Sequence, residues 1–135
     1  MTNEKIRVLA FGTFDIFHPG HEYYLKEAAK LGDLYVVVAR DKTVERVKGK
    51  PARNNEKKRL AVIAALPYVA KTLLGKEDNY YDVIEEIAPD VIALGYDQKA
   101  FVEGLRAELS ARGLNPKIVR FNSFEPHKYK SSLLK

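Results

Sequence analysis

The stretch from Gly12 to His21 constrains the fold of this chain more than any other part of its sequence. It reads Gly-Thr-Phe-Asp-Ile-Phe-His-Pro-Gly-His and follows an apolar run of strand length at residues 6–11. After it, apolar residues recur at helical spacing from Tyr24 to Leu31. The stretch therefore predicts a turn between the carboxyl end of a buried parallel strand and the amino end of a helix. That edge of an α/β sheet is where such folds bind ligands.

The histidines of this stretch suit an anion site. Pro19 fits the first position of a helix, which makes His18 the predicted N-cap and His21 a first-turn residue. Free N–H groups and the helix dipole favour an anion there, and Gly12 and Gly20 would let the backbone approach it. Either histidine alone is more readily explained as a capping or surface residue. The pair, with two glycines and a proline, favours a phosphate chain as the ligand.

The remainder of the chain continues the alternation of strands and helices. Short apolar runs predict strands, and apolar residues at helical spacing predict helices. We expect strands at 33–39, 70–74, 91–94 and 117–121, and helices from about 42, from Asn54 or Asn55 to about Pro67, at 80–87 and from about Ala100 to Arg112. This βαβαβαβαβ pattern predicts a single α/β domain, residues 1–135, with three layers and right-handed crossovers.

A basic segment interrupts a chain that is otherwise close to neutral. Residues 40–59 contain nine Lys or Arg and three Asp or Glu, against a net charge of +5 for the whole chain. The composition points to an anionic partner, a nucleotide or a nucleic acid, although a solvated connecting segment explains it more simply. No aromatic residue lies within the segment, which argues against stacking on single-stranded nucleic acid. Lys48 and Lys50 flank Gly49 in a predicted loop, from which flexible ammonium groups could close over phosphates.

Several classes of protein are excluded by composition and length. The chain contains no cysteine, so disulfides and thiolate metal sites are absent. No apolar run approaches the ~18 residues of a membrane span, and residues 1–5 lack the apolar region of a signal peptide. We therefore expect a soluble cytoplasmic protein without a membrane partner. With 135 residues there is no room for an added tRNA-binding module, and no nucleic-acid partner is expected.

Motifs along the chain resemble those of the HxGH nucleotidyltransferases, in their cytidylyltransferase-like branch, with archaeal-type FAD synthetases the most similar. The similarity covers nearly the whole chain. The motifs that carry it are Gly12-Thr13-Phe14-Asp15, His18-Pro19-Gly20-His21, Ala39-Arg40-Asp41, Glu56 with Arg59, Ala93-Leu94-Gly95-Tyr96-Asp97-Gln98 and Ser123-Phe124-Glu125. One departure concerns two cysteines near the C-terminus of many such enzymes, where this chain has His127 and Lys130. A role assigned to those thiols cannot apply here.

The resemblance implies a Rossmann-like nucleotidyltransferase fold with a five-stranded parallel sheet in the order 3-2-1-4-5. It also implies that the phosphate of FMN attacks the α-phosphorus of ATP, giving FAD and pyrophosphate, with a divalent metal ion such as Mg²⁺ whose ligands stay unknown. A homodimer is expected. The residues implied in catalysis are His18, His21, Lys48 and Lys50, and those implied in nucleotide binding are Thr13, Phe14, His18, Pro19, Gly20, His21, Asp97, Phe124, Ser131 and Ser132. Two alternatives remain open, a CTP-dependent glycerol-3-phosphate cytidylyltransferase and a nucleotide-binding module without turnover.

Some of these residues also allow a structural interpretation. Asp41, at the carboxyl end of the second strand, suits the site and the cap of the next helix equally well. Asp97 could accept hydrogen bonds from ribose hydroxyls or a base amine, or it could form an ordinary turn. Phe124 could lie beside a base or flavin ring, or belong to the core. Ser131 and Ser132 could meet phosphate oxygens at the start of a final helix, or lie in a disordered tail.

Overall fold

The computed structural model describes residues 6–76, 81–95 and 99–121 of the chain, with the side chains of 99–103 excepted. Within these residues, parallel strands form one sheet in the order β3-β2-β1-β4-β5, as the resemblance implied. The strands are β1 (Arg7–Gly12), β2 (Asp33–Val38), β3 (Lys71–Leu74), β4 (Val91–Leu94) and β5 (Lys117–Arg120). They begin and end within one residue of the expected positions, because each is a short apolar run between polar or turn residues.

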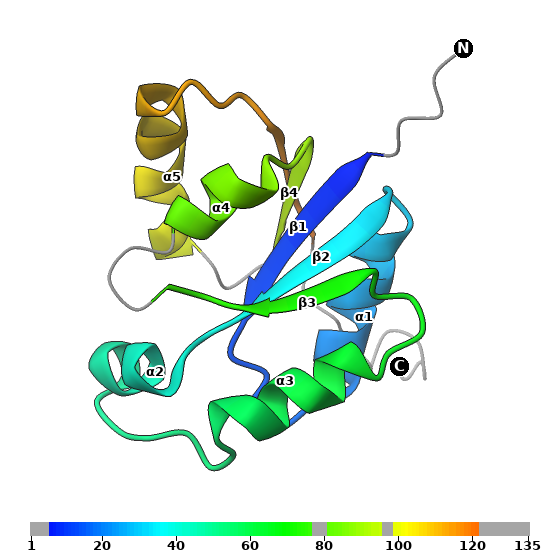
Figure 1. Ribbon diagram of the computed structural model, residues 1–135, viewed down its shortest axis with the longest axis vertical. Helices are drawn as coiled ribbons and strands as arrows, with labels where there is room; N and C mark the ends of the chain where they lie inside the picture. The colour runs from blue at the N-terminus through cyan, green and yellow to red at the C-terminus, as the bar shows by residue number, and fades with distance from the viewer. Residues whose placement is uncertain (1–5, 77–80, 96–98, 122–135) are drawn as a thin grey trace, which may run out of the picture.

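Helices cover both faces of the sheet, so the expected three layers are present (Figure 1). On one face lie α1 (Pro19–Ala29) and α3 (Glu56–Ala64), and on the other lie α4 (Tyr81–Ile87) and α5 (Lys99–Ala111). A further helix, α2 (Asp41–Lys48), stands beyond the carboxyl end of β2. The expected loop from Lys48 to Pro51 is therefore shorter than predicted, because Lys48 still belongs to α2 and the helix ends at Gly49 with φ 78°.

Two apolar clusters hold the layers together. Side chains of successive strand residues point to opposite faces, so the central strands β1 and β2 feed both clusters. The first cluster joins the sheet to α1 and α3 through residues including Val36, Val38, Leu25 and Ile63. The second joins it to α4 and α5 through Leu9, Ile92, Ile84, Leu105 and Leu109 among others. Among the described residues, no helix is both long enough and apolar enough to cross a membrane.

The pairing between β1 and β4 ends before the pairing between β1 and β2. β1 pairs with β2 as far as Gly12, but it pairs with β4 only from Val8 to Ala10. The strands on either side of this junction connect to helices on opposite faces, since α1 follows β1 and α5 follows β4 (Figure 1). This point, where the strand order reverses, is the general position of ligand sites in open α/β sheets.

Candidate active site

The turn after β1 is shaped by Phe14, whose ring folds back into the core. Phe14 is 3% exposed and adopts φ 54°, a left-handed conformation that is rare for a residue with a side chain. A Cβ added to Gly12 would lie 2.5 Å from Cζ of the Phe14 ring. We expected Gly12 to admit a phosphate, but the space that it leaves is occupied by this ring. Gly12 therefore makes room for the Phe14 ring. The packed turn then sets the direction of the residues that follow.

His18 is the N-cap of α1, and Pro19 occupies the first helical position, as predicted. The Nδ1 atom of His18 accepts a hydrogen bond from the backbone N–H of Gly20 at 3.1 Å. A neutral imidazole that accepts at Nδ1 carries its proton at Nε2, so this capping bond leaves His18 with a donor on its outer edge. A Cβ on Gly20 would meet the His18 ring at 3.0 Å, so Gly20 makes room for the imidazole of its own motif.

The two imidazoles form a stack that rests on aromatic side chains. The rings of His18 and His21 lie 3.8 Å apart between centroids and 20° from parallel. His21 also meets the Phe14 ring edge-on at 5.2 Å and lies 5.8 Å from the Phe17 ring. His18 is exposed, whereas His21 is half-buried because Phe14 and Phe17 pack against it.

Tyr24, on α1, fills the place where β1 and β4 part. Its hydroxyl accepts from the N–H of Phe11 at 3.3 Å and donates to the carbonyl of Ala93 at 2.6 Å. These backbone groups lie at the point where the β1–β4 pairing stops, so the phenol serves both strands at once. The helix that begins with the histidine motif is thereby tied directly to the strand ends.

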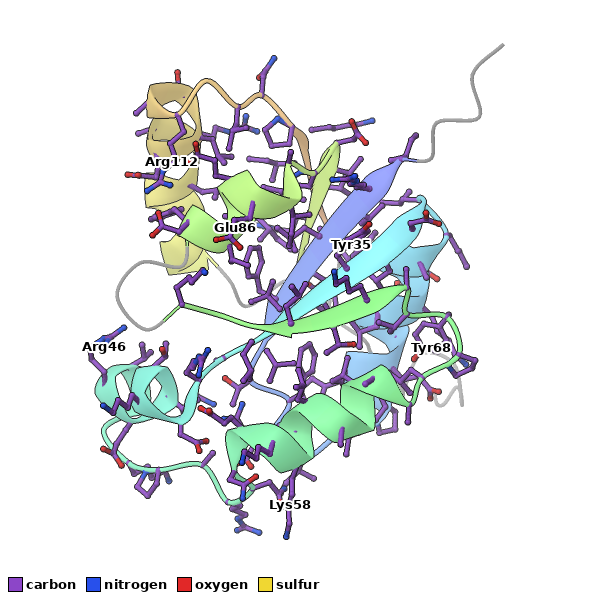
Figure 2. The ribbon with its side chains drawn as sticks, viewed as in Figure 1. Tyr35, Arg46, Lys58, Tyr68, Glu86 and Arg112 are labelled. Atoms are coloured by element: carbon purple, nitrogen blue, oxygen red, sulfur yellow. The ribbon has the colours of Figure 1, made fainter. Side chains whose placement is uncertain are left out.

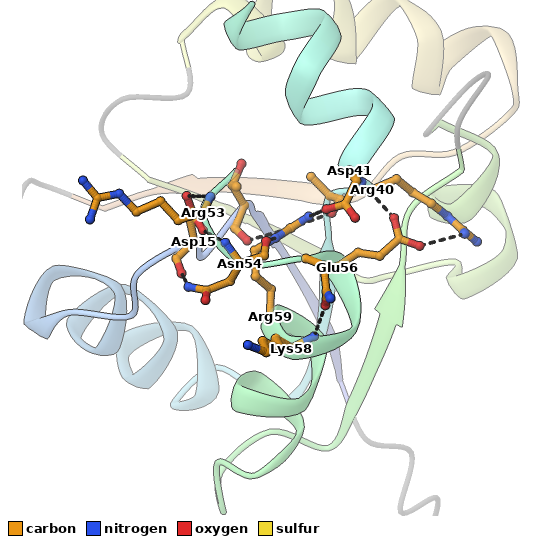
Figure 3. A network of polar contacts seen from close by, with 11 residues as sticks. Asp15, Arg40, Asp41, Arg53, Asn54, Glu56, Lys58 and Arg59 are labelled. Atoms are coloured by element: carbon orange, nitrogen blue, oxygen red, sulfur yellow. Dashed lines mark hydrogen bonds and ion pairs between the residues drawn. The ribbon is translucent and has the colours of Figure 1, made fainter. Parts of the chain in front are cut away.

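Arg59, on α3, forms hydrogen bonds to several segments at this end of the sheet (Figure 3). A basic residue within a helix is more often at the surface, but Arg59 is 1% exposed. Its guanidinium donates to the carbonyls of Asn54 at 2.9 Å, Thr13 at 3.0 Å and Ala39 at 2.7 Å, and to the carboxylate of Asp41 at 2.7 Å. These acceptors belong to the turn after β1, the end of β2, the start of α2 and the loop before α3. Arg59 therefore fixes the relative positions of the segments that carry the expected site.

The start of α2 is held from outside the helix. Its N-cap, Arg40, makes no side-chain capping bond. Instead Glu56 of α3 accepts from the N–H of Asp41 at 2.8 Å and lies 3.5 Å from the guanidinium of Arg40. Asp41, for which two roles were open, occupies the first helical turn and pairs with Arg59. Its contacts are thus structural in the described part of the chain.

The part of the basic segment from Lys48 to Asn55, here called the basic rim, lies largely on the surface. Lys48, Gly49, Lys50 and Pro51 are exposed, and a Cβ on Gly49 would meet nothing within 4 Å. The exposed side chains of α2 and of the start of α3 reach outward from this end of the molecule, as Arg46 and Lys58 do in Figure 2. A cavity of about 400 Å³ lies between α2 and α3, lined by Asp41, Lys42, Glu45, Pro51, Ala52, Arg53, Asn55 and Lys58.

Asp15 joins the histidine turn to the far end of this rim. Its Oδ2 and Oδ1 atoms accept from the N–H groups of Arg53 and Asn54, both at 2.8 Å. The Asn54 side chain donates back to the carbonyl of Asp15 at 2.5 Å. These two backbone donors, assisted by the charges of Arg59 and Lys48, hold the pKa of the Asp15 carboxyl below its ordinary value.

The structure thus brings most of the expected site residues to one end of the sheet. Thr13, Phe14, His18, Pro19, Gly20 and His21 lie in one turn, and Lys48 and Lys50 lie on the neighbouring rim. Asp97, Phe124, Ser131 and Ser132 lie outside the described residues.

Sequence reasoning assigned no role to Asp15 or Tyr24, and it misplaced Arg59. Asp15 stands inside the motif, which was a signal, but its partners are backbone groups 38 and 39 residues away. Tyr24 was read only as an apolar position of α1.

In the described ranges, no group of three or more His, Asp or Glu side chains is arranged to hold a metal ion. Mg²⁺ commonly keeps several waters and binds through substrate phosphates with one or two carboxylates. The described residues therefore form no cage made by the protein alone, and a metal ion there would take its other ligands from bound phosphates and water.

The comparisons with known proteins agree with this arrangement. The family model described as cytidylyltransferase-like matches residues 9–135, so the chain belongs to the cytidylyltransferase-like family of nucleotidyltransferases. Among its relatives is the FAD synthase of Archaeoglobus profundus, 50% identical over 94% of this chain and 81% of that protein. The FAD synthase of Aciduliprofundum boonei is 48% identical over 88% of this chain and 80% of that protein. The crystal structure of the lipopolysaccharide core biosynthesis protein from Thermoplasma volcanium is also similar, with 44% identity, a TM-score of 0.84, and coverage of 90% of this chain and 100% of that one.

Proposed function

We propose that this nucleotidyltransferase is a FAD synthetase, which transfers AMP from ATP to FMN and releases pyrophosphate. The observation that carries the proposal is the stacked histidine pair at the start of α1, in a chain about half identical to proteins named FAD synthase over most of their length. The helix end offers backbone N–H groups and a positive dipole, and His18 offers its Nε2–H, which together suit a polyphosphate.

The reaction needs no covalent intermediate with the protein. A phosphate oxygen of FMN attacks the α-phosphorus of ATP in line, so that a new P–O bond forms. The bond between the α-phosphorus and the bridging oxygen breaks, and pyrophosphate leaves with that electron pair. Because the FMN phosphate is already an anion, no base has to remove a proton from it. The work of the protein is to position two anions and to stabilise the negative charge that develops on the leaving group.

The described residues divide this work between two groups. His18, His21 and the backbone N–H of Gly20 in the first turn of α1 would face the α- and β-phosphates, with backbone groups of the preceding turn beside the nucleotide. Pro19 supplies no N–H, and the N–H of Gly20 would reach phosphate after exchanging its bond to His18. Lys48 and Lys50 would approach the β- and γ-phosphates from the rim as mobile point charges.

A divalent metal ion bound to the triphosphate would neutralise part of its charge. Because the described residues form no metal cage, the ion would be held mainly by substrate oxygens and water. The residues named above act on the phosphates directly. The expected homodimer and cytoplasmic location stay predictions.

A panel of substrates tests the proposal. The purified protein is incubated with each nucleoside triphosphate and Mg²⁺ together with FMN or glycerol 3-phosphate, and pyrophosphate and FAD are measured. We expect pyrophosphate and FAD in equal amounts from ATP with FMN, and neither product when one substrate is omitted. Efficient turnover of CTP with glycerol 3-phosphate, and none of ATP with FMN, would assign the protein to the glycerol-3-phosphate cytidylyltransferases instead.

A further inference from the structure

A largely exposed loop joins α2 to α3. It begins at Gly49, where α2 ends and a Cβ would meet nothing within 4 Å. Near its end, the N–H groups of Arg53 and Asn54 donate to the carboxylate of Asp15 (Figure 3). Immediately afterwards Asn55 caps α3 by accepting from the N–H of Lys58. The hydrogen bonds of Asp15 therefore lie at the base of the exposed loop.

Asp15 itself belongs to the turn that carries the histidines. It precedes His18 by three residues, and its own carbonyl is bound by the Asn54 side chain, so that the turn and the loop hold each other reciprocally. Both carboxylate oxygens are occupied by backbone donors. An amide in place of the carboxylate could satisfy only one of them, because its NH₂ group would face the other N–H.

We propose that Asp15 is a positioning residue, which fixes the loop after α2 to the histidine turn. Lys48, at the end of α2, and Lys50, on the loop, then meet the same triphosphate as His18 and His21. This inference rests on the proposed function. It makes the reach of the two lysines depend on a carboxylate that touches no substrate. Without the hydrogen bonds of Asp15, the lysines would keep their charge but would no longer be held near the phosphates.

Limited trypsin digestion tests the anchor without any substrate. Trypsin cleaves after Arg53, and the scissile peptide bond contains the N–H of Asn54 that Asp15 binds. A segment must leave its hydrogen bonds and extend before a protease can cut it. We expect cleavage after Arg53 to be at least about tenfold faster in Asp15→Ala, with a smaller increase in Asp15→Asn. Circular dichroism checks that both variants are folded.

Asp90→Ala is the matched control. The carboxylate of Asp90, like that of Asp15, accepts a backbone N–H, here that of Arg7 at 2.9 Å, but Asp90 lies at the opposite end of the sheet. Its removal should leave cleavage after Arg53 unchanged. If folded Asp15→Ala and Asp15→Asn are also cut at the wild-type rate, Asp15 does not anchor the loop and the inference is wrong.

A double-mutant cycle then separates positioning from simple stability. The dissociation constants of ATP and of CTP, each with Mg²⁺, are measured for wild type, Asp15→Asn, the pair Lys48→Ala with Lys50→Ala, and the combination. We expect the lysine pair to weaken binding about tenfold in the wild-type background and less than about twofold in Asp15→Asn. Equal lysine effects in both backgrounds would overturn the positioning role even if trypsin cleavage is faster. If neither nucleotide binds to the wild type, the proposed function fails, and the trypsin result alone reports on the anchor.

Discussion

Replacing Arg59 by alanine removes the side chain that joins the segments of the candidate site. The guanidinium is fully buried, while its partner Asp41 is half exposed. Water can therefore solvate the carboxylate of Asp41 after the substitution, and the ion pair itself contributes little because it is partly screened. The loss falls mainly on the carbonyls of Thr13, Ala39 and Asn54, which are left without the donor that they have in the native protein.

The expected destabilisation follows from these contacts. Each part-buried acceptor that loses its partner costs about 1–3 kcal/mol, with the lower end appropriate where the chain can relax. Taken at the lower end, three such carbonyls and the empty volume of a large side chain give about 3–5 kcal/mol. In a chain of this length that corresponds to a fall in Tm of roughly 10–20 °C.

Thermal unfolding followed by circular dichroism measures this change, with Lys57→Ala as the control. Lys57 lies on the same helix and is exposed, so its removal changes the charge equally and should stay within about 0.5 kcal/mol of wild type. Arg59→Lys should fall between the two, because one ammonium cannot reach acceptors on four segments. A Tm for Arg59→Ala within 2 °C or so of the control would refute the argument that this arginine holds the site together.

Further predictions concern the site itself. His18→Ala and His21→Ala should each lower kcat by roughly 10²–10³, the usual effect of losing one transition-state donor, and wild-type rates in both folded variants would contradict the assignment. The His21 variant should also have a lower Tm than wild type, because His21 is half-buried against aromatic rings. Lys48→Ala with Lys50→Ala should raise the KM for nucleotide, and added salt should reduce the difference from wild type because exposed charges are screened; a salt-independent KM ratio would argue against direct phosphate contact. The pKa of Asp15 is lowered in the folded protein, so its hydrogen bonds to the loop are fully present above the ordinary value of 3.8 and are lost as the pH falls through the lower folded-state value. Protection of the Arg53 amide from hydrogen exchange should therefore persist at pH 5. Loss of that protection between pH 6 and pH 5 would show that another group controls the loop.

The fold could be predicted because its signals are local. Continuous apolar runs such as Val36–Val38 are typical of strands buried on both faces, and Pro19 fixed the start of α1 to the residue. The order of the strands came from the resemblance of the motifs, since neighbouring positions in a sheet leave little trace in single segments. The boundary at Lys48 was missed because a glycine both breaks a chain and ends a helix in the left-handed conformation.

The contacts of the site could be predicted only in part, because many of them join distant segments. Arg59 looks like a surface residue of a helix, and its burial depends on carbonyls contributed by the ends of two strands and by a loop. The use of Gly12 likewise depends on where the Phe14 ring turns, which a sequence pattern does not specify. Backbone acceptors and donors carry no residue signature, so their side-chain partners are the residues that sequence reasoning misplaces.

The hydroxyl of Tyr24 restricts how this enzyme can respond to its substrates. It bonds to Phe11 and Ala93 at once, so α1 cannot slide or rotate against the sheet without breaking contacts to both β1 and β4. The histidine end of α1 is therefore a rigid floor. Among the described residues, we expect closure around a nucleotide from the opposite wall, where α2 and the loop after it are held by polar contacts and bury few side chains. A fluorescent label at the exposed start of the loop should accordingly report a larger displacement on nucleotide binding than a label on α1.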